Sequence, residues 1–317
     1  MNFQVETLKN INLVNGENYL KRVENVMPAR RERFLKFNEE NMHNTNEVIF
    51  HSEIDEEFHK RYDYFVIGSD QIWNYNFKDR FSDAVFASFA PIEKRISLSA
   101  SFGISNVPKE NYNLYVGLKD MKAISVRESA GAEIVKNITG RDDAVVLIDP
   151  TMMLSVEKWS SIMKKPEQLK AKKYILKYFL GKFSKENQEK IEKFAKENDC
   201  EIIDVLDKET FYATGPSEFL YLIKNSYLVI TDSFHSCVFS ILFNKPFLIF
   251  KRDQFKMSNM YSRIDTLLEK FQLNDRKFDG RIEQSIVDVD YSHIENILSQ
   301  EQQKVHKFLK KALNVEM

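Results

Sequence analysis

The sequence predicts an α/β protein with two parallel-sheet domains of the Rossmann type and a C-terminal helix. Short apolar runs, of the kind buried on both faces of a parallel sheet, alternate with amphipathic helical stretches along the chain. The length of 317 residues corresponds to about two domains. We therefore place an N-terminal domain at residues 1–155, a C-terminal domain at 156–285 and a final helix at 286–317.

The N-terminal domain begins with a basic helical segment and continues with four predicted strands. The helix covers Pro28–Asn41, and its arginines are expected to form a solvated face. Each strand is a short apolar run that ends in polar or turn-forming residues. The four runs are Tyr64–Ile67, Ile96–Ala100, Ala123–Val126 and Ala144–Ile148.

Polar side chains gather where the first of these strands ends. Gly68 permits a tight exit from the strand. The polar residues that follow it are Ser69, Asp70, Gln71 and Asn74. This density suits a binding or catalytic site, with Asp70 as a catalytic candidate and Ser69 as a substrate contact. A helix cap at Asp70 and a core position for Trp73 explain the same residues equally well.

Arg127 stands at the end of the third strand, where a guanidinium can grip a carboxylate or phosphate through two parallel hydrogen bonds. The alternative is an ion pair with Glu128 or with another acid. The fourth strand is followed by Asp149-Pro150, and the proline restricts Asp149 to extended conformations. We expect the N-terminal domain to end there.

The C-terminal domain repeats the alternation of strands and helices. Its predicted strands are Tyr174–Leu180, Glu201–Leu206, Tyr227–Ile230 and Phe247–Phe250. Its predicted helices lie within Ser155–Lys170 and at Ser184–Asn198, Pro216–Asn225 and Ser258–Phe271, and the final helix is His293–Asn314.

His235 is the main catalytic candidate. It lies in the first turn of a helix that follows the strand Tyr227–Ile230, and the intervening residues include Asp232 and Ser233. Ligands of open α/β sheets bind beyond the carboxyl ends of strands, and helix N-termini attract anions. A surface or structural histidine is the alternative, but the polar neighbours and the strand-to-helix position favour a functional role. We expect Asp232 to orient His235 or to accept a proton.

Three cations come after the next strand. Lys251 and Arg252 stand directly beyond its end, and Arg263 lies early in the following helix. We expect them to help Arg127 hold an anionic ligand.

Composition excludes several classes of function. The net charge of −1 favours neither nucleic-acid binding nor more than peripheral membrane association. Two distant cysteines and the lack of a signal peptide or a membrane-length apolar run predict a cytoplasmic location without disulfides. Only nine glycines are present, so glycine-rich phosphate loops are missing, and no metal-ligand spacing occurs. We expect neither a metal nor a cofactor.

Seven stretches, taken together and in order, resemble the polysaccharide pyruvyl transferase family. They are Ile67–Asn74, Ser99–Gly103, Ile124–Ser129, Asp149–Thr151, Gly215–Leu220, Thr231–His235 and Ser262–Leu268. The resemblance covers about residues 30–275.

The resemblance implies a GT-B-like fold and transfer of a pyruvyl group from phosphoenolpyruvate to a pair of sugar hydroxyls. The product would be a ketal on a capsular, exopolysaccharide or other cell-surface glycan, with a glycan or lipid-linked oligosaccharide as acceptor. By the family pattern, His235 would be the acid/base residue and Arg127 would hold the donor. Phe234 would stand where main-chain contacts to the donor are expected, next to Ser233.

Two departures from the family pattern matter. Nothing before Met27 matches the strand, Asn-Tyr-Gly loop and helix with which family members usually begin. We therefore expect that about one βα unit is absent from the protein or lies before the first residue of this sequence. Ser236-Cys237 also replaces the glycine that usually follows the histidine.

Two rival functions stay open. One is a GT-B-type glycosyltransferase that uses a nucleotide sugar, with Glu218 contacting the ribose. The other is a truncated, non-catalytic relative that only binds glycan.

Overall fold

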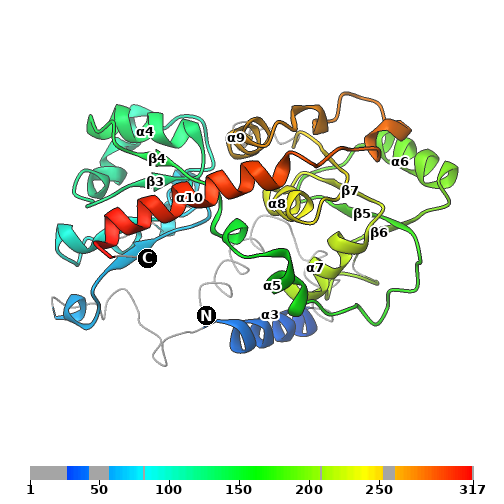
Figure 1. Ribbon diagram of the computed structural model, residues 1–317, viewed down its shortest axis with the longest axis horizontal. Coiled ribbons are helices and arrows are strands. Elements are labelled where there is room, and N and C mark those ends of the chain that lie inside the picture. Colours follow the sequence, from blue (N-terminus) through cyan, green and yellow to red (C-terminus); the bar gives the residue numbers. More distant parts are fainter. Residues whose placement is uncertain (1–26, 43–56, 81–82, 208, 253–260, 316–317) are drawn as a thin grey trace. The chain divides into compact units, whose positions relative to one another are not determined.

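The computed structural model describes residues 27–42, 57–80, 83–207, 209–252 and 261–315, which form two compact units (Figure 1). The described residues of unit 1 lie within 27–42, 156–250 and 279–288. Those of unit 2 lie within 57–155, 251–278 and 289–315. The α/β class with parallel sheets is confirmed in both units.

The division differs from the predicted domains at three segments, although the boundary after residue 155 agrees. The helix α3 (Met27–Asn41) belongs to unit 1, where it contacts α7. Residues 251–278 belong to unit 2, since their helix α9 (Ser262–Lys270) contacts α4. The final helix α10 (Ile294–Leu313) is also part of unit 2, where it contacts the turn at Pro150–Met153.

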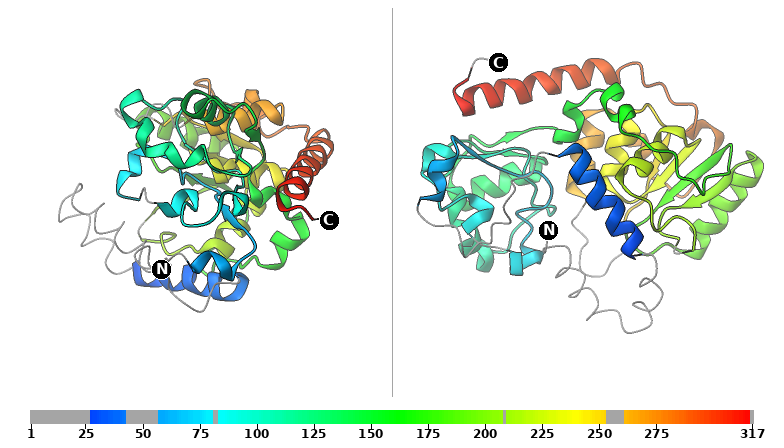
Figure 2. Two further views of the ribbon diagram at one scale, coloured as in Figure 1. Left: turned by 90° about the vertical axis from the view of Figure 1, so that its left-hand side faces the viewer. Right: turned by 90° about the horizontal axis from the view of Figure 1, so that it is seen from below.

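Unit 1 contains a four-stranded parallel sheet in the order β6-β5-β7-β8. Its strands are β5 (Tyr174–Tyr178), β6 (Glu201–Asp204), β7 (Leu228–Thr231) and β8 (Phe247–Ile249). All four were predicted from their apolar runs, and Figure 2 shows them among the helices of the unit. The chain moves from β5 to one side and returns to place β7 on the other side. The carboxyl ends of β5 and β7 therefore flank a topological switch point, where α/β proteins bind ligands.

The helices of unit 1 cover both faces of this sheet. They are α5 (Val156–Ser161), α6 (Lys185–Glu197), α7 (Pro216–Asn225) and α8 (Phe234–Leu242). Because β-α-β crossovers are right-handed, the reversal after β6 puts α6 on one face and α7 and α8 on the other. Helices α7 and α8 contact each other. Every residue of α8 is buried except His235, which is half-buried.

Helix α3 corrects one prediction. Arg30 donates a hydrogen bond to the carbonyl of Tyr212 (2.8 Å), and Arg33 donates one to the carbonyl of Ala213 (3.0 Å). The guanidinium of Arg30 also lies 5.0 Å from the centre of the Tyr212 ring. The predicted solvated face is therefore wrong for Arg30 and Arg33, whose side chains join α3 to the rest of unit 1, whereas Arg31 is exposed as predicted.

Unit 2 contains four short parallel strands joined in the order β1-β2-β3-β4. They are β1 (Phe65–Ile67), β2 (Arg95–Ser97), β3 (Ser125–Val126) and β4 (Val145–Val146). Strands β1 and β2 pair, as do β3 and β4, and two bridges, Ile96 to Ala123 and Ala100 to Val126, join the pairs. All four strands were predicted, with longer bounds. Because they are parallel, their carboxyl ends meet at one edge.

The core of unit 2 is built around Trp73, which is fully buried. Its indole nitrogen donates to the carbonyl of Val85 (2.9 Å), and the Tyr115 hydroxyl donates to the carbonyl of Trp73 (2.7 Å). The core position considered for Trp73 is confirmed. Helix α4 (Ser129–Thr139), which packs beside β3 and β4, was not predicted.

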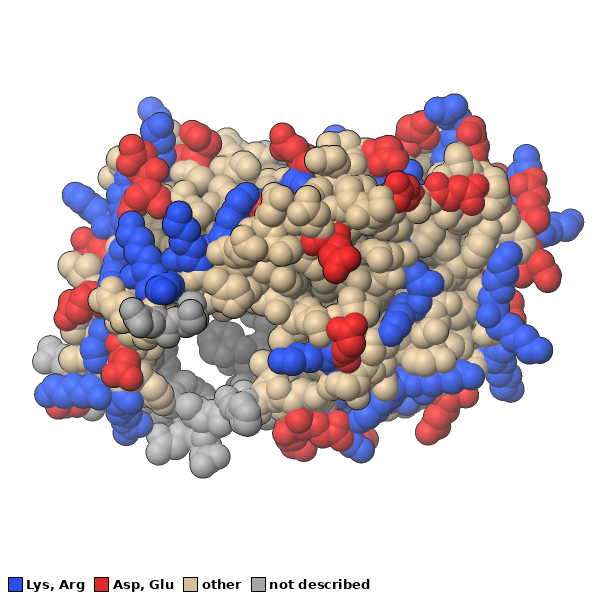
Figure 3. All heavy atoms as spheres, in the orientation of Figure 1, with Lys and Arg blue, Asp and Glu red and all other residues tan. Residues whose placement is uncertain are grey.

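Helix α10 is fixed to unit 2 through a buried carboxylate. Glu301 is 4% exposed and accepts hydrogen bonds from Lys270 of α9 and Lys304 of α10, each at 2.5 Å. Lys and Arg side chains gather over the C-terminal half of α10 in Figure 3. Helix α10 contributes four exposed lysines there: Lys304, Lys307, Lys310 and Lys311.

Candidate functional site

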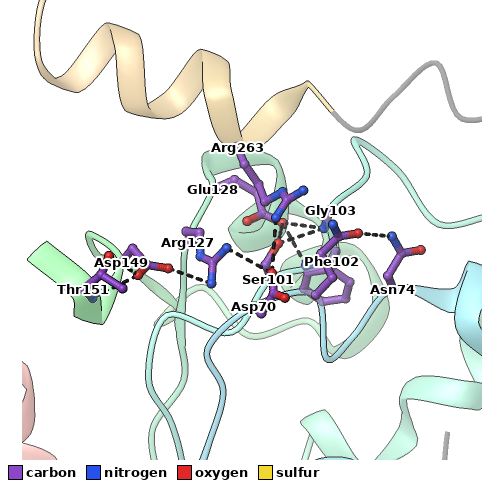
Figure 4. A network of polar contacts seen from close by, with 11 residues as sticks. Asp70, Asn74, Ser101, Phe102, Gly103, Arg127, Glu128, Asp149, Thr151 and Arg263 are labelled. Carbon is purple, nitrogen blue, oxygen red and sulfur yellow. Dashed lines mark hydrogen bonds and ion pairs between the residues drawn. The ribbon is translucent and has the colours of Figure 1, made fainter. Parts of the chain in front are cut away.

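The polar network of unit 2 lies at the carboxyl edge of its sheet, and every strand contributes to it (Figure 4). Asp70 follows β1, and the segment Ser99–Gly103 follows β2. Arg127 and Glu128 follow β3, and Asp149 follows β4. The parallel arrangement explains why polar residues separated by up to eighty positions come together here.

Arg127 is held by Asp149. Its Nη2 lies 2.7 Å from Asp149 Oδ2, and both side chains are 1% exposed. The other carboxylate oxygen of Asp149 accepts from the backbone N–H (3.0 Å) and the hydroxyl (2.7 Å) of Thr151. The ion pair with an acid that we considered for Arg127 is thus confirmed, with Asp149 as the partner and not Glu128. This pairing leaves Nη1 directed toward Asp70.

A second guanidinium reaches the same carboxylate. Arg263, from the first turn of α9, has its Nη1 3.4 Å from Asp70 Oδ1, and Nη1 of Arg127 is also 3.4 Å from that oxygen. Burial, together with the positive charges of Arg127 and Arg252, lowers the pKa of Arg263 to about 10, although Asp70 and Glu128 act in the opposite direction. Three predicted substrate-binding arginines therefore lie within electrostatic reach of one another.

Glu128 supports the network from inside. It is fully buried, and its Oε1 accepts from the backbone N–H groups of Phe102 (2.8 Å) and Gly103 (3.0 Å) and from the hydroxyl of Ser101 (3.1 Å). Its Oε2 is buried and has no hydrogen-bond partner among the described residues. Burial raises the pKa of Glu128, and Arg263 is the strongest of the neighbours that lower it. Sequence reasoning considered Glu128 only as a partner for Arg127.

The loop after β1 owes its course to Gly68. Its φ is +121°, and a Cβ at this position would lie 2.5 Å from the carbonyl oxygen of Leu98, so the predicted need for glycine is confirmed. Ser69 follows half-buried. Asn74 is fully buried and donates to Gln71 Oε1 (2.7 Å), which keeps both of these side chains occupied within the loop.

The candidate site of unit 1 lies at the switch point of its sheet. Thr231 ends β7, donates to the carbonyl of Tyr178 in β5 (2.7 Å) and accepts from the backbone N–H of Ser233 (3.0 Å). Asp232 is 4% exposed and accepts from the backbone N–H groups of Leu180 and Gly181, each at 2.8 Å. Because these two bonds engage both carboxylate oxygens, Asp232 fixes the loop after β5 against the start of α8.

His235 is half-buried, whereas the residues on either side of it in α8 are buried. Its ring lies edge-on to that of Phe234, with 5.4 Å between the centroids. Phe234 and Ser233 are 5% and 6% exposed, so the first turn of α8 presents the imidazole more than its neighbours. Ser236, which stands where the family pattern has glycine, is fully buried.

The predicted site residues thus fall into two groups, each within one unit. Unit 2 brings together Asp70, Arg127 and Arg263, with the charge of Arg252 acting on Arg263, and it also contains the half-buried Ser69 and the exposed Lys251. Unit 1 brings together Asp232, Ser233, Phe234 and His235.

Comparison with known proteins identifies the family. Residues 17–254 match the family described as Polysaccharide pyruvyl transferase. The chain belongs to this family. A polysaccharide pyruvyl transferase transfers pyruvyl groups onto polysaccharide, and the match supports this activity in general terms. The matched region contains Asp70, Arg127 and His235 and ends before Arg263.

Other comparisons add little to this membership. No curated protein matches the chain. Among solved structures, this polysaccharide pyruvyl transferase is similar to Methanocaldococcus jannaschii UDP-GlcNAc 2-epimerase in complex with UDP-GlcNAc and UDP. The identity is 15%, the match covers 83% of this chain and 87% of the other, and the TM-score is 0.39. A TM-score this low supports no inference, and the GT-B-like arrangement of the units stays a prediction.

The surroundings of Glu218 argue against the nucleotide-sugar site that was considered there. One oxygen of this carboxylate accepts from the backbone N–H of Gly215 (3.2 Å), which caps the start of α7, and the other lies 3.8 Å from Arg33 Nε. The side chain is only 14% exposed. These contacts occupy the group that the rival hypothesis assigned to ribose.

The described residues contain neither a candidate metal-binding cluster nor a helix able to span a membrane. Within residues 27–42, 57–80, 83–207, 209–252 and 261–315, no group of three or more His, Cys, Asp or Glu side chains is placed to hold a metal ion. No helix in that part of the chain combines the length and the apolar character needed to cross a membrane.

Proposed function

We propose that this polysaccharide pyruvyl transferase takes its pyruvyl group from phosphoenolpyruvate and forms a cyclic ketal on two hydroxyls of one sugar. The acceptor would be a capsular, exopolysaccharide or other cell-surface glycan, or its lipid-linked precursor. Both cysteines are free, which supports a reducing, cytoplasmic location. The proposed chemistry requires no metal or cofactor.

The convergence of Arg127 and Arg263 on one carboxylate oxygen carries the proposal. Phosphoenolpyruvate has a carboxylate and a phosphate close together, so a site for it needs at least two cationic groups. Two buried guanidiniums that already share an exposed anion, with the charge of Arg252 near them, meet this requirement. Donor binding is therefore assigned to these three arginines, with Lys251 as a further cation and Ser69 as a hydrogen-bonding group.

His235 is assigned the proton transfers. An ordinary histidine titrates near neutral pH, so its imidazole can donate and accept protons in one catalytic cycle. Its position in the first turn of α8 and its greater exposure than the neighbouring residues support contact with substrate. The backbone at Ser233 and Phe234 begins the same helix, whose N-terminal N–H groups favour anions. Asp232 has a positioning role, because its two oxygens hold the loop after β5.

The reaction would proceed in two additions. The protonated His235 donates a proton to the methylene carbon of phosphoenolpyruvate, and C2 becomes electrophilic. A sugar hydroxyl adds to C2, and its proton passes to the neutral imidazole. The bond between C2 and the phosphate oxygen then breaks, a second hydroxyl of the same sugar bonds to C2, and its proton leaves with inorganic phosphate. One ketal and one phosphate result.

Replacing His235 by alanine tests the assignment. Phosphate release from phosphoenolpyruvate in the presence of lipid-linked oligosaccharides should fall at least about 100-fold, because general acid–base catalysis contributes that much or more. The melting temperature should change little, since the ring is half-buried and not part of the fully buried core. His306→Ala, at an exposed position of α10, is the matched control and should retain full activity. Near-parental turnover by His235→Ala would exclude the role.

Ligand stabilisation separates this proposal from its rivals. Phosphoenolpyruvate should raise the melting temperature of the parent protein, because a ligand that binds the folded state stabilises it. Stabilisation by a nucleotide sugar in its place would support a glycosyltransferase. Stabilisation by glycan alone would support a non-catalytic binding protein.

A further inference from the structure

Asp70 differs from the other members of the network in its exposure. Its side chain is 68% exposed, whereas those of Arg127 and Arg263 are 1% and 8% exposed. The Asp70 carboxylate is thus a solvent-accessible anion that lies against two buried guanidinium groups.

The contacts of Asp70 are also the longest in the network. Both guanidinium nitrogens lie 3.4 Å from its Oδ1, compared with 2.7 Å between Arg127 and Asp149. Charge-assisted hydrogen bonds between such groups are normally about 2.7–2.9 Å long. Asp70 therefore neutralises the two arginines without making an optimal bond to either.

The position that Asp70 fills requires an anion. Arg127 has a buried partner in Asp149, but Arg263 lies near the charges of both Arg127 and Arg252. Burial and Arg127 lower the pKa of Arg263 to about 10. Asp70 is the acidic group that most strongly favours the charged form of Arg263, ahead of the buried Glu128, so its departure would remove a major counter-charge.

The backbone allows the side chain to leave without opening the loop. The carbonyl of Asp70 accepts from the backbone N–H of Ser101 (2.8 Å), and Gly68 fixes the exit from β1. Asp70 has a φ of +47°, a conformation held by these neighbours. Rotation of its side chain would uncover Nη1 of both arginines while the main chain stays in place.

We propose that the Asp70 carboxylate occupies, in the ligand-free protein, an anion subsite formed by Arg127 and Arg263, and that a phosphate or carboxylate group of the ligand displaces it. The inference rests on the proposed function only in taking phosphoenolpyruvate as the natural ligand. It gives Asp70 a role as a resident competitor, in place of the catalytic role expected from the sequence. Selectivity follows, because only ligands whose anionic group outcompetes a tethered carboxylate can enter.

Asp70→Asn tests the competition directly. Asparagine keeps the size of the side chain but removes its charge. Inorganic phosphate, titrated calorimetrically, should bind Asp70→Asn about two- to fivefold more tightly than the parent, the range expected from losing one exposed ion pair. Without phosphate the variant should melt at a lower temperature than the parent. Added phosphate should abolish this difference in melting temperature, because it replaces the missing negative charge. Asp63→Asn, at an exposed position outside the network, is the matched control and should match the parent.

Two further variants keep the test decisive. Asp70→Glu retains the charge and should not tighten phosphate binding. The double variant Asp70→Asn, Arg263→Gln should not bind phosphate more tightly than the parent, because one of the two guanidinium groups of the subsite has been removed. Weaker or unchanged phosphate binding by Asp70→Asn, or no saturable binding at all, would overturn the proposal.

The test is independent of catalysis. If Asp70→Asn tightens phosphate binding but the parent transfers no pyruvyl group, the proposed donor is wrong and the displaceable carboxylate stands. If transfer occurs and phosphate binding is unaffected by Asp70→Asn, only the displacement is wrong.

Discussion

At the scale of single residues, Glu128 is an ionisable carboxyl group that is fully buried within the polar network of unit 2. Its Oε1 accepts three hydrogen bonds from Ser101, Phe102 and Gly103, while burial favours the neutral form of the carboxyl. Burial and hydrogen bonding thus act in opposite directions on its ionisation. The raised pKa of Glu128 indicates that burial prevails.

This balance predicts a pH dependence for Glu128→Gln. Since the pKa is raised in the folded state, the folded protein binds the proton more tightly, and the carboxyl's contribution to the unfolding free energy decreases as pH rises through the window. Glutamine does not titrate and retains an oxygen for the three donors. As the pH rises above about 4.5, the parent should therefore lose stability relative to the variant, by about 1.4 kcal/mol in total for each unit by which the pKa is raised.

Urea denaturation at several pH values measures this shift. Glu110→Gln, an exposed site without a described ion pair, is the control and should show a constant difference from the parent. A constant difference for Glu128→Gln as well would contradict the raised pKa.

The sequence identified Arg127 as a strand-end cation, because an apolar run ends abruptly before it. It did not identify the acid that holds it, since Asp149 is adjacent only when β4 pairs with β3. For the same reason the main-chain partners of Asp232, about fifty residues earlier, could not be predicted. Residue type and strand position are local properties, whereas the choice between binding and positioning roles depends on long-range partners.

At the scale of secondary-structure elements, strands were predicted more reliably than some helices. All eight strands of the described residues coincide with apolar runs, although the structure shortens several of them. Helix α4 was missed although its apolar residues Ala130, Ile134, Val135 and Ile138 recur at helical spacing. Its buried residues are Gly131, Ile134 and Val135. Helix α7 was predicted with its observed bounds, since Pro216 suits its first turn.

Helix α10 depends on the carboxylate of Glu301. Replacing Glu301 by alanine removes the two hydrogen bonds from Lys270 and Lys304 and should lower the unfolding free energy by about 2–3 kcal/mol, the usual range for hydrogen bonds to charged groups. Amide exchange in α10 should quicken with it. Glu295→Ala, at an exposed position near the start of the same helix, is the control. Equal effects of the two substitutions would contradict this account.

At the scale of the whole molecule, the main difference from prediction is the division of the chain. A single cut after residue 155, with a separate C-terminal helix, is the simplest interpretation of the alternating pattern. The structure instead assigns the described residues within 251–278 and 289–315 to the same unit as those within 57–155. Periodicity shows that a helix has an apolar face, but the sheet against which this face packs is not encoded in the helix itself.

Deleting residues 289–317 tests this assignment. Unit 2 would lose the buried positions Ile294, Val305 and Ala312, so its amides in β1–β4 should exchange at least about tenfold faster. Amides of β5–β8 in unit 1 serve as the internal control and should change little. Hydrogen exchange with mass spectrometry measures both sets in one sample. Unchanged protection of β1–β4 would instead support an independent C-terminal helix.

The return of the chain to unit 2 also has a consequence for biosynthesis. Residues 57–155 leave the ribosome long before 261–315, which complete the same unit. The apolar surface of residues 57–155 that α9 and α10 will later cover must therefore remain exposed while the residues in between are translated. Chaperone protection during this interval is expected to influence the yield of intact protein more than any single contact in the finished molecule.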